Sequence, residues 1–227
     1  MNVRVTTRLP VKPGIVTGLA FEATIARTKA PFAPIACHGP GLSRAIAAAR
    51  ALLSTGVDAL VSFGVAGALD PSLRPGTAVL PQRVIDGNGE AFSCDDGWRG
   101  VVLARTPTLD SQGDLLTATD PVTCARHKAT VFETSGARVV DMESAGIAAV
   151  AREHGVPFIA LRVVLDEARH TIPRAAMAGM RPDGETSAAA TIAALLRRPH
   201  DIVDLLRLAR ANQAARQGLA RLAHLAF

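Results

Sequence analysis

Residues 139–165 read VVDMESAGIAAVAREHGVPFIALRVVL, and the predicted fold is organised around this stretch. A pair of valines ends one apolar run, and Asp141 can cap a helix whose apolar residues leave the charged residues near its end for solvent. Gly155 then ends the helix. Residues 156–165 are a nearly unbroken apolar run, as expected of a strand that is covered on both faces. The stretch therefore predicts a strand–helix–strand unit.

Two carboxylates frame this unit. Glu143 lies in the first turn of the helix, and Asp166 directly follows the second strand. Open α/β sheets bind ligands outside the carboxyl ends of their strands, where two acidic groups would meet a polyhydroxy or basic ligand. The alternative is that Glu143 only complements the helix dipole and that Asp166 only begins a loop. Arg162 lies inside the apolar strand, and we expect its partner to be an acidic neighbour in the fold rather than a ligand.

The rest of the chain alternates strands with helices. The pattern predicts strands at 14–20, 31–37, 58–63, 79–85, 101–105 and 113–117, and helices at 21–27, 42–54, 121–133, 187–197 and 201–225. Residues 86–98 are expected to form the longest loop. We therefore predict one α/β domain over residues 1–227, a three-layer α/β/α sandwich with a central mixed, largely parallel sheet. Its closing helices occupy about residues 187–225.

Composition indicates a folded globular protein, with 48% hydrophobic and 20% charged residues. The longest apolar runs have the length of strands, and the amino terminus lacks the apolar core of a signal peptide. We expect no transmembrane span and a cytoplasmic location.

The three cysteines, Cys37, Cys94 and Cys124, are widely spaced and lack histidines at metal-ligand intervals. The sequence therefore predicts no disulfide, no metal site and no cofactor.

The net charge of +5 and the pI of about 9.8 raise the question of an anionic partner. Outside the final helix the arginines are dispersed, and with one tryptophan and no tyrosine there is no aromatic platform for single-stranded nucleic acid. We expect no nucleic-acid binding. The final helix is basic and amphipathic, so it either makes peripheral contact with a membrane or packs its leucines on the sheet or on another subunit. Packing is the favoured interpretation.

Small residues follow the strand predicted at 58–63. Gly64, Ala66 and Gly67 would let the backbone approach a ligand closely. Their spacing matches neither a dinucleotide fingerprint nor a P-loop, because no Lys-Ser/Thr pair follows. Glycine alone is a weak indication of a site.

Four motifs in this order resemble the purine nucleoside phosphorylase/nucleosidase superfamily, which includes the methylthioadenosine/S-adenosylhomocysteine nucleosidases. The motifs are LAFE at 19–22, SFGVAGAL at 62–69 with LRPG at 73–76, VDMESAG at 140–146 and LRVVLD at 161–166. The later segments DEARHTIPR, RPDGE and LLRLARANQAAR look like the hopanoid-associated branch of the superfamily. That branch implies removal of adenine from adenosylhopane, which leaves ribosylhopane.

The resemblance implies a role for each matching residue. Asp166 matches the general acid that protonates N7 of the purine, and partial burial should raise its pKa. Glu143 matches the carboxylate that accepts hydrogen bonds from the ribose 2′- and 3′-hydroxyls, and Met142 packs on the sugar. Glu22 matches the residue that polarises the attacking water. Further substrate contacts are expected at Gly64, Val65, Ala66, Gly67 and Leu19, and at Thr119 in the segment 117–122 that would read the adenine.

The choice between water and phosphate as nucleophile depends on Glu22. Bacterial hexameric phosphorylases of the superfamily place a phosphate-binding arginine at this position, a second arginine at the position of Ser62 and a phosphate-binding serine at that of Val65. A phosphate dianion beside Glu22 would be repelled, so the resemblance favours hydrolysis. An arginine from elsewhere, such as Arg27, Arg44 or one on another subunit, would instead allow phosphate as co-substrate.

Two departures from the family pattern affect the expected site. Leu165 replaces the serine that normally orients the acid, so Asp166 must find another hydrogen-bond partner. Leu19 replaces a methionine near the ribose, which is a mild change for an apolar contact.

The leading hypothesis is hydrolysis of an adenosine that carries a large, lipid-like 5′-substituent. The alternatives are a phosphorylase, a methylthioadenosine or S-adenosylhomocysteine nucleosidase, and a non-catalytic nucleoside-binding module. The resemblance also implies a homo-oligomer, in which a neighbouring subunit completes the site or leaves it unchanged.

Overall fold

A computed structural model describes residues 9–173, 176 and 201–226. In chain order its elements are β1 (Pro13–Thr17), α1 (Ala20–Lys29), β2 (Ile35–Cys37), α2 (Leu42–Leu53), β3 (Ala59–Ala68), β4 (Ala78–Val79), β5 (Arg83–Ile85), β6 (Ala91–Ser93), α3 (Asp96–Arg105), β7 (Leu115–Thr117), α4 (Ala125–Ser135), β8 (Val139–Asp141), α5 (Ser144–Glu153), β9 (Phe158–Asp166) and α8 (Ile202–Ala226).

Within the described residues, nine strands form one mixed sheet around β3. The order β2-β1-β3-β8-β7-β5-β6 is joined by β9, which pairs with β3 and with β4. Strands β1 and β9 run parallel to β3, whereas β8 meets the end of β3 in the antiparallel direction. The sheet is thus mixed and largely parallel, as the sequence predicts.

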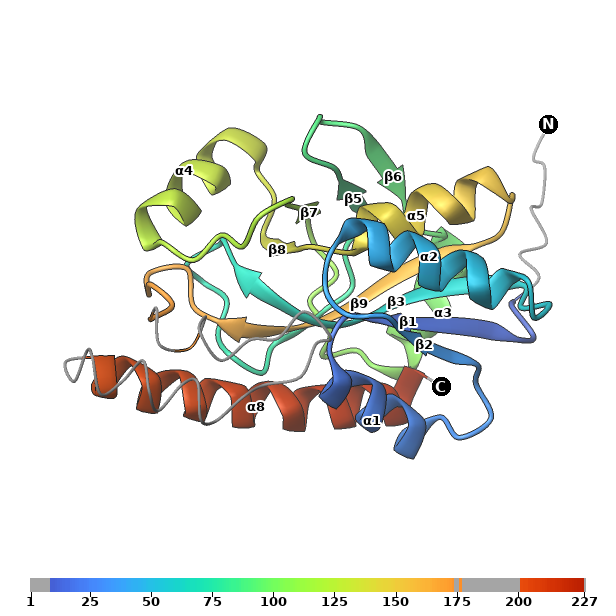
Figure 1. Ribbon diagram of the computed structural model, residues 1–227, viewed down its shortest axis with the longest axis horizontal. Helices are drawn as coiled ribbons and strands as arrows, with labels where there is room; N and C mark the ends of the chain where they lie inside the picture. The colour runs from blue at the N-terminus through green and yellow to red at the C-terminus, as the bar shows by residue number, and fades with distance from the viewer. Residues whose placement is uncertain (1–8, 174–175, 177–200, 227) are drawn as a thin grey trace.

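Helices cover both faces of the sheet. In Figure 1, α2 and α5 lie together on one face, and α1 and α8 lie together on the other. The core between them is apolar; strand β9 is buried along nearly its whole length, from Phe158 to Val164. Gly155 adopts a φ of +64° after α5, so the residue that ends the helix in the sequence analysis does so in the structure. The three-layer α/β/α architecture is confirmed.

Some predicted elements differ from the observed ones. Residues 101–105 belong to helix α3 rather than to a strand, because the Asp95 side chain accepts a hydrogen bond from the Trp98 backbone N–H (2.8 Å) and starts a helix there. The predicted strand 79–85 is interrupted, giving β4 and β5. The predicted loop 86–98 contains β6 and the start of α3, and α4 begins at Ala125 rather than near Pro121. The predicted helix at 187–197 lies outside the described residues.

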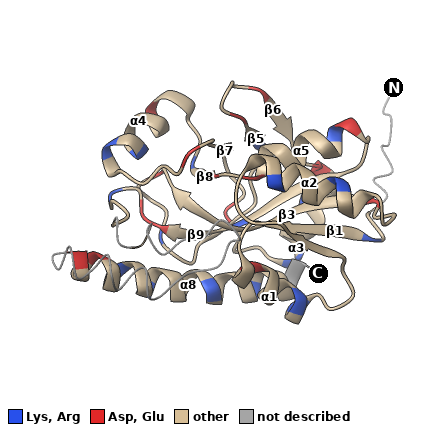
Figure 2. Ribbon diagram, in the orientation of Figure 1, with Lys and Arg blue, Asp and Glu red and all other residues tan. Residues whose placement is uncertain are grey.

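Helix α8 packs on the sheet through its C-terminal half, where Leu219 and Leu222 are buried. Its N-terminal half exposes Ile202, Val203 and Leu206. Figure 2 shows basic residues distributed over α1, α2, α4 and α8 rather than gathered on one element. No helix among the described residues has the length and apolar character needed to cross a membrane. Packing therefore accounts for the C-terminal leucines of this helix, and membrane contact stays a prediction.

Candidate active site

Glu22 is held by backbone amides from two parts of the fold. It lies in the first turn of α1, just after β1, and its Oε2 accepts hydrogen bonds from the N–H groups of Gly18 (3.0 Å) and Leu19 (2.9 Å). Its Oε1 accepts from the N–H of Val65 in β3 (2.8 Å). Burial raises the pKa of Glu22 to about 7, while the nearby Arg162 guanidinium and the Val65 N–H oppose the rise. The carboxylate is fixed in place and can change protonation near neutral pH.

Glu143 occupies the junction between β8 and α5. Its Oε1 accepts a hydrogen bond from the N–H of Gly41 (2.9 Å), and its Oε2 accepts from the N–H of Met142 (3.3 Å). Burial raises the pKa of this carboxyl, and the charge of Asp141 raises it further. Glu143 also adds to the rise in the pKa of Glu22, so these two carboxyls share one electrostatic environment.

Arg162, a residue of strand β9, is the cation beside these carboxyls. Its side chain is 1% exposed and lies 2.7 Å from Asp141 Oδ2 and 3.9 Å from Glu143 Oε2. Its Nη2 also donates to the hydroxyls of Ser62 (2.6 Å) and Ser144 (3.0 Å). The expectation that Arg162 pairs with an acidic neighbour in the fold is confirmed.

Asp141 makes more contacts than its predicted role as a helix cap requires. It ends strand β8, accepts hydrogen bonds from the backbone N–H groups of Glu143 and Ser144, and receives the Thr117 hydroxyl (2.8 Å) as well as the arginine. The first residue flanking α5 is Glu143 itself. Asp141 therefore fixes both the start of α5 and the guanidinium of Arg162.

Three glycines make room for these acidic side chains. A Cβ on Gly18 would lie 3.1 Å from Glu143 Oε1, one on Gly64 would lie 2.6 Å from Glu22 Oε1, and one on Gly67 would lie 3.3 Å from Asp166 Oδ1. Gly64 and Gly67 belong to strand β3, which continues to Ala68, where the sequence suggested a loop after Phe63. The glycines therefore serve the close approach of carboxylates to backbone, and that approach is the physical reason for their position.

Asp166 closes strand β9 beside Gly67. The β3–β9 register shifts between Ala66 and Gly67, so that Gly67 pairs with Asp166 and Leu165 is left out of the pairing. Such a bulge re-aims the side chains that follow it. Burial raises the pKa of Asp166, and Lys128 opposes the rise.

Lys128 is the hydrogen-bond partner of Asp166 that the sequence did not identify. Its Nζ donates to Asp166 Oδ2 and to the backbone carbonyls of Glu167 (2.9 Å) and His170 (3.1 Å). The side chain is fully buried although it extends from α4, 38 residues away from the aspartate. The one available signal was rarity, since Lys128 is one of only three lysines in the chain.

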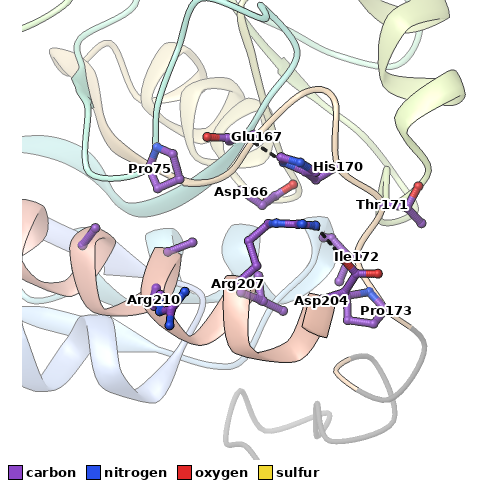
Figure 3. Close-up of a pocket in the computed structure, with 13 residues that line it drawn as sticks. Pro75, Asp166, Glu167, His170, Thr171, Ile172, Pro173, Asp204, Arg207 and Arg210 are labelled. Atoms are coloured by element: carbon purple, nitrogen blue, oxygen red, sulfur yellow. Dashed lines mark hydrogen bonds and ion pairs between the residues drawn. The ribbon is translucent and has the colours of Figure 1, made fainter. Parts of the chain in front are cut away.

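A cavity of about 280 Å³ opens beside Asp166, between the turn that follows β9 and helix α8 (Figure 3). Its lining comprises Pro75, Asp166, Glu167, His170, Thr171, Ile172, Pro173, Asp204, Arg207, Leu208, Arg210, Ala211 and Ala214. Glu22 and Glu143 do not line it, so the cavity reaches the predicted acid but not the predicted ribose contacts.

Four of the predicted substrate contacts, Gly64 to Gly67, are residues of β3 itself. Leu19 flanks the first turn of α1, and Met142 is half-buried next to Glu143. Ala66 is buried in the core and offers little side-chain surface to a ligand. Thr119 is exposed in a separate open groove near Gly87, which none of the three acidic residues lines. Its contact with the base stays a prediction.

A metal site has no support in the described part of the chain, where no three histidine, cysteine, aspartate or glutamate side chains are grouped to hold an ion. The predicted absence of a cofactor is not tested by this observation. The chemistry available at the site is that of three buried carboxyls, Glu22, Glu143 and Asp166, each with a raised pKa; backbone N–H groups hold the first two, and Lys128 holds the third.

A family model described as the phosphorylase superfamily matches residues 7–198. No curated protein matches the chain. Among solved structures, the 5′-methylthioadenosine/S-adenosylhomocysteine nucleosidase of Neisseria meningitidis in complex with methylthio-immucillin-A superposes with a TM-score of 0.70 at 16% identity, covering 94% of this chain and 97% of that one. Futalosine hydrolase of Helicobacter pylori gives a TM-score of 0.65 at 16% identity, covering 93% and 96%. At these identities the likeness is one of fold.

Proposed function

This chain belongs to the phosphorylase superfamily, and on that premise we propose that it hydrolyses the N-glycosidic bond of a 5′-substituted adenosine and releases adenine. Cleavage of this bond develops positive charge on the ribose and negative charge on the departing base. An enzyme for the reaction needs a proton donor at the base, a hold on the sugar and a positioned nucleophile. Asp166, Glu143 and Glu22 are proposed for these three roles.

The environment of Glu22 carries the proposal. Three backbone N–H groups orient its carboxylate, and a pKa of about 7 suits a general base that works near neutral pH. A water hydrogen-bonded to this carboxylate could be deprotonated as it attacks C1′ of the ribose. The proton would pass to Glu22, and the C1′–N9 bonding electrons would leave with the base.

Charge among the described residues favours water over phosphate. In that part of the chain, Glu22, Asp141 and Glu143 lie around one guanidinium, that of Arg162. Arg27 and Arg44, which could have supplied additional positive charge, are both exposed. A phosphate dianion would meet an excess of negative charge in a buried setting, where repulsion is weakly screened.

Glu143 and Asp166 fit the sugar and the base. An ionised carboxylate accepts hydrogen bonds from both ribose hydroxyls, and fixation by Gly41 leaves lone pairs on each Glu143 oxygen for this purpose. Asp166 has the raised pKa that a proton donor requires. Along β3, Val65 donates to Glu22 and Gly67 adjoins Asp166, so the backbone positions that the two carboxyls approach are two strand residues, roughly 7 Å, apart. We propose that the ribose and the purine lie along this part of the strand.

The finer proposal is that the 5′-substituent is apolar and lipid-like, with adenosylhopane as the substrate in hopanoid biosynthesis. It is supported by the resemblance of residues 166–174 and 205–216 to the hopanoid-associated branch. Pro75, Ile172 and Leu208 contribute apolar surface to the cavity at α8, which charged residues of the β9 turn and of α8 line as well. The same cavity also reaches Asp166, the proposed proton donor to the base.

The experiment compares adenine release from adenosylhopane, 5′-methylthioadenosine and S-adenosylhomocysteine by the purified protein. We expect release of adenine, with the highest kcat/KM for adenosylhopane. Rapid turnover of the two sulfur compounds with none of adenosylhopane would overturn the proposed substrate. The proposed hydrolysis of a 5′-substituted adenosine would still hold. No adenine from any of the three would favour the nucleoside-binding module and overturn the enzymatic proposal.

A further inference from the structure

We propose that Lys128 is a positioning residue of this active site: its ammonium group holds Oδ2 of Asp166, so that Oδ1 is the oxygen that carries the proton to the purine. The inference rests on the proposed role of Asp166 as the acid. It adds a residue from α4 to a site whose other members lie on α1, α5, β3 and β9.

The geometry around the ammonium group is complete. Lys128 is fully buried, and its Nζ meets three acceptors, namely Asp166 Oδ2 and the carbonyl oxygens of Glu167 and His170. A lysine ammonium has three N–H donors and no acceptor, so all three donors are used. A neutral amine would place a lone pair against one of these oxygens. The surroundings therefore fit the charged form, and a charge-assisted hydrogen bond fixes Oδ2.

The second oxygen of Asp166 is left for chemistry. Among the described residues, Oδ1 has no hydrogen-bond partner, and it faces Gly67, where a Cβ would approach to 3.3 Å. The ammonium favours negative charge on Oδ2, so a proton on the carboxyl resides on Oδ1. In the reaction this proton moves to N7 of the purine while the C1′–N9 bond breaks. Asp166 is left as a carboxylate paired with the unchanged Lys128 ammonium.

A purely structural role is the competing explanation. Lys128 also ties α4 to the turn after β9, and neighbouring bonds join Ile172 N–H to the Thr123 carbonyl (2.9 Å) and Ala125 N–H to Thr171 Oγ1 (3.2 Å). Loss of those contacts would lower the rate by loosening the turn. It would not change how the carboxyl of Asp166 titrates.

The titration of Asp166 separates the two roles. Lys128 lowers the pKa of this carboxyl against the effect of burial, so a variant without the charge should hold the proton to higher pH. The other charged or titratable groups around the cavity are Glu167, His170, Asp204, Arg207 and Arg210, together with Arg74, which pairs with Glu167. All of them are retained in the variants, so a shift reports the loss of Lys128.

The test uses Lys128→Met, which removes charge and donor, and Lys128→Gln, which removes the charge but keeps a donor. Lys29→Met is the matched control, because Lys29 is exposed on α1. The carboxyl of Asp166 is followed by ¹³C NMR, assigned by its absence in Asp166→Asn, and adenine release from adenosylhopane is measured across pH. Lys128→Gln decides the question if Lys128→Met does not fold.

We expect the Asp166 titration and the alkaline limb of kcat to move together to higher pH in both variants. At neutral pH, kcat should fall roughly 10- to 100-fold in Lys128→Met and less in Lys128→Gln. Lys29→Met should match the wild type. An unmoved titration in a folded variant would overturn the proposal, even with a lower kcat. Full activity of Asp166→Asn would instead overturn the proposed acid, which is a separate result.

Discussion

Gly64 lies directly beside Arg162 in the β3–β9 pair, and the guanidinium together with the Glu22 carboxylate fills the space that a side chain at position 64 would need. The register of two strands thus sets the position of the groups around the proposed nucleophile. Because Glu22 is itself fixed by three backbone hydrogen bonds, it cannot move away without losing them. The tolerance of this position to substitution should therefore be small.

We predict that Gly64→Ala lowers kcat/KM about 100-fold, since a Cβ placed 2.6 Å from Glu22 Oε1 would displace the carboxylate. Steady-state kinetics on adenine release measure the effect. The control is Gly100→Ala in α3, where a Cβ meets open space and alanine favours the helix by about 1 kcal/mol. Equal activity of the two variants would show that the packing around Glu22 is unimportant.

Arg162→Met should lower the free energy of unfolding by about 3–5 kcal/mol, because the variant leaves the buried carboxylates of Asp141 and Glu143 without their cation. Denaturant unfolding at neutral pH measures this difference. Arg50→Met is the comparison, since the Arg50–Glu153 pair is 57% exposed on each side and should contribute at most about 1 kcal/mol. If the two variants lost similar free energies of unfolding, the central place of Arg162 in the site would be contradicted.

The pH dependence of kcat/KM should report Glu22. A general base must be ionised to act, and burial places the pKa of Glu22 at about 7, so activity should rise as pH increases through 7 and fall below it. Glu22→Gln should have a low rate without this acidic limb. A wild-type profile that stays flat between roughly pH 5 and 8 would assign the base elsewhere.

Asp166→Asn should bind substrate but lose at least about 100-fold in kcat, because an amide cannot transfer a proton to N7 of the departing adenine. Isothermal titration with the substrate and single-turnover adenine release measure the two effects separately. Turnover near the wild-type level would show that another group protonates the base.

The sequence predicted those parts of the site that lie on continuous stretches. The unit from Val139 to Asp166 carries its own signals, and the terminating glycine and the buried apolar strand were found. The helix begins at Ser144 with Glu143 at its N-cap position, two residues later than a cap at Asp141 predicts. The sequence also predicted that Arg162 would pair with an acid. It did not reveal that Asp141 would be that acid, because the choice depends on how β8 and β9 pack.

Contacts between elements that are distant in the chain could not be predicted from the sequence. Lys128 reaches Asp166 from a helix whose position is set by the whole fold, and no spacing rule links the two residues. The short apolar run at 101–105 suits a strand or a helix equally, and the cap at Asp95 decided for the helix. Strand β3 was predicted too short because glycine is disfavoured in strands, whereas here Gly64 and Gly67 admit the side chains of the site.

In the proposed reaction water, rather than phosphate, attacks the ribose beside Glu22. The most direct measurement is the initial rate of adenine release from adenosylhopane in phosphate-free buffer and after addition of phosphate, with the sugar product identified by mass spectrometry. Hydrolysis should give equal rates in both buffers, with ribosylhopane, whose C1′ carries a hydroxyl, as the sugar product. Adenine release that requires phosphate, with a ribose 1-phosphate as the product, would contradict it.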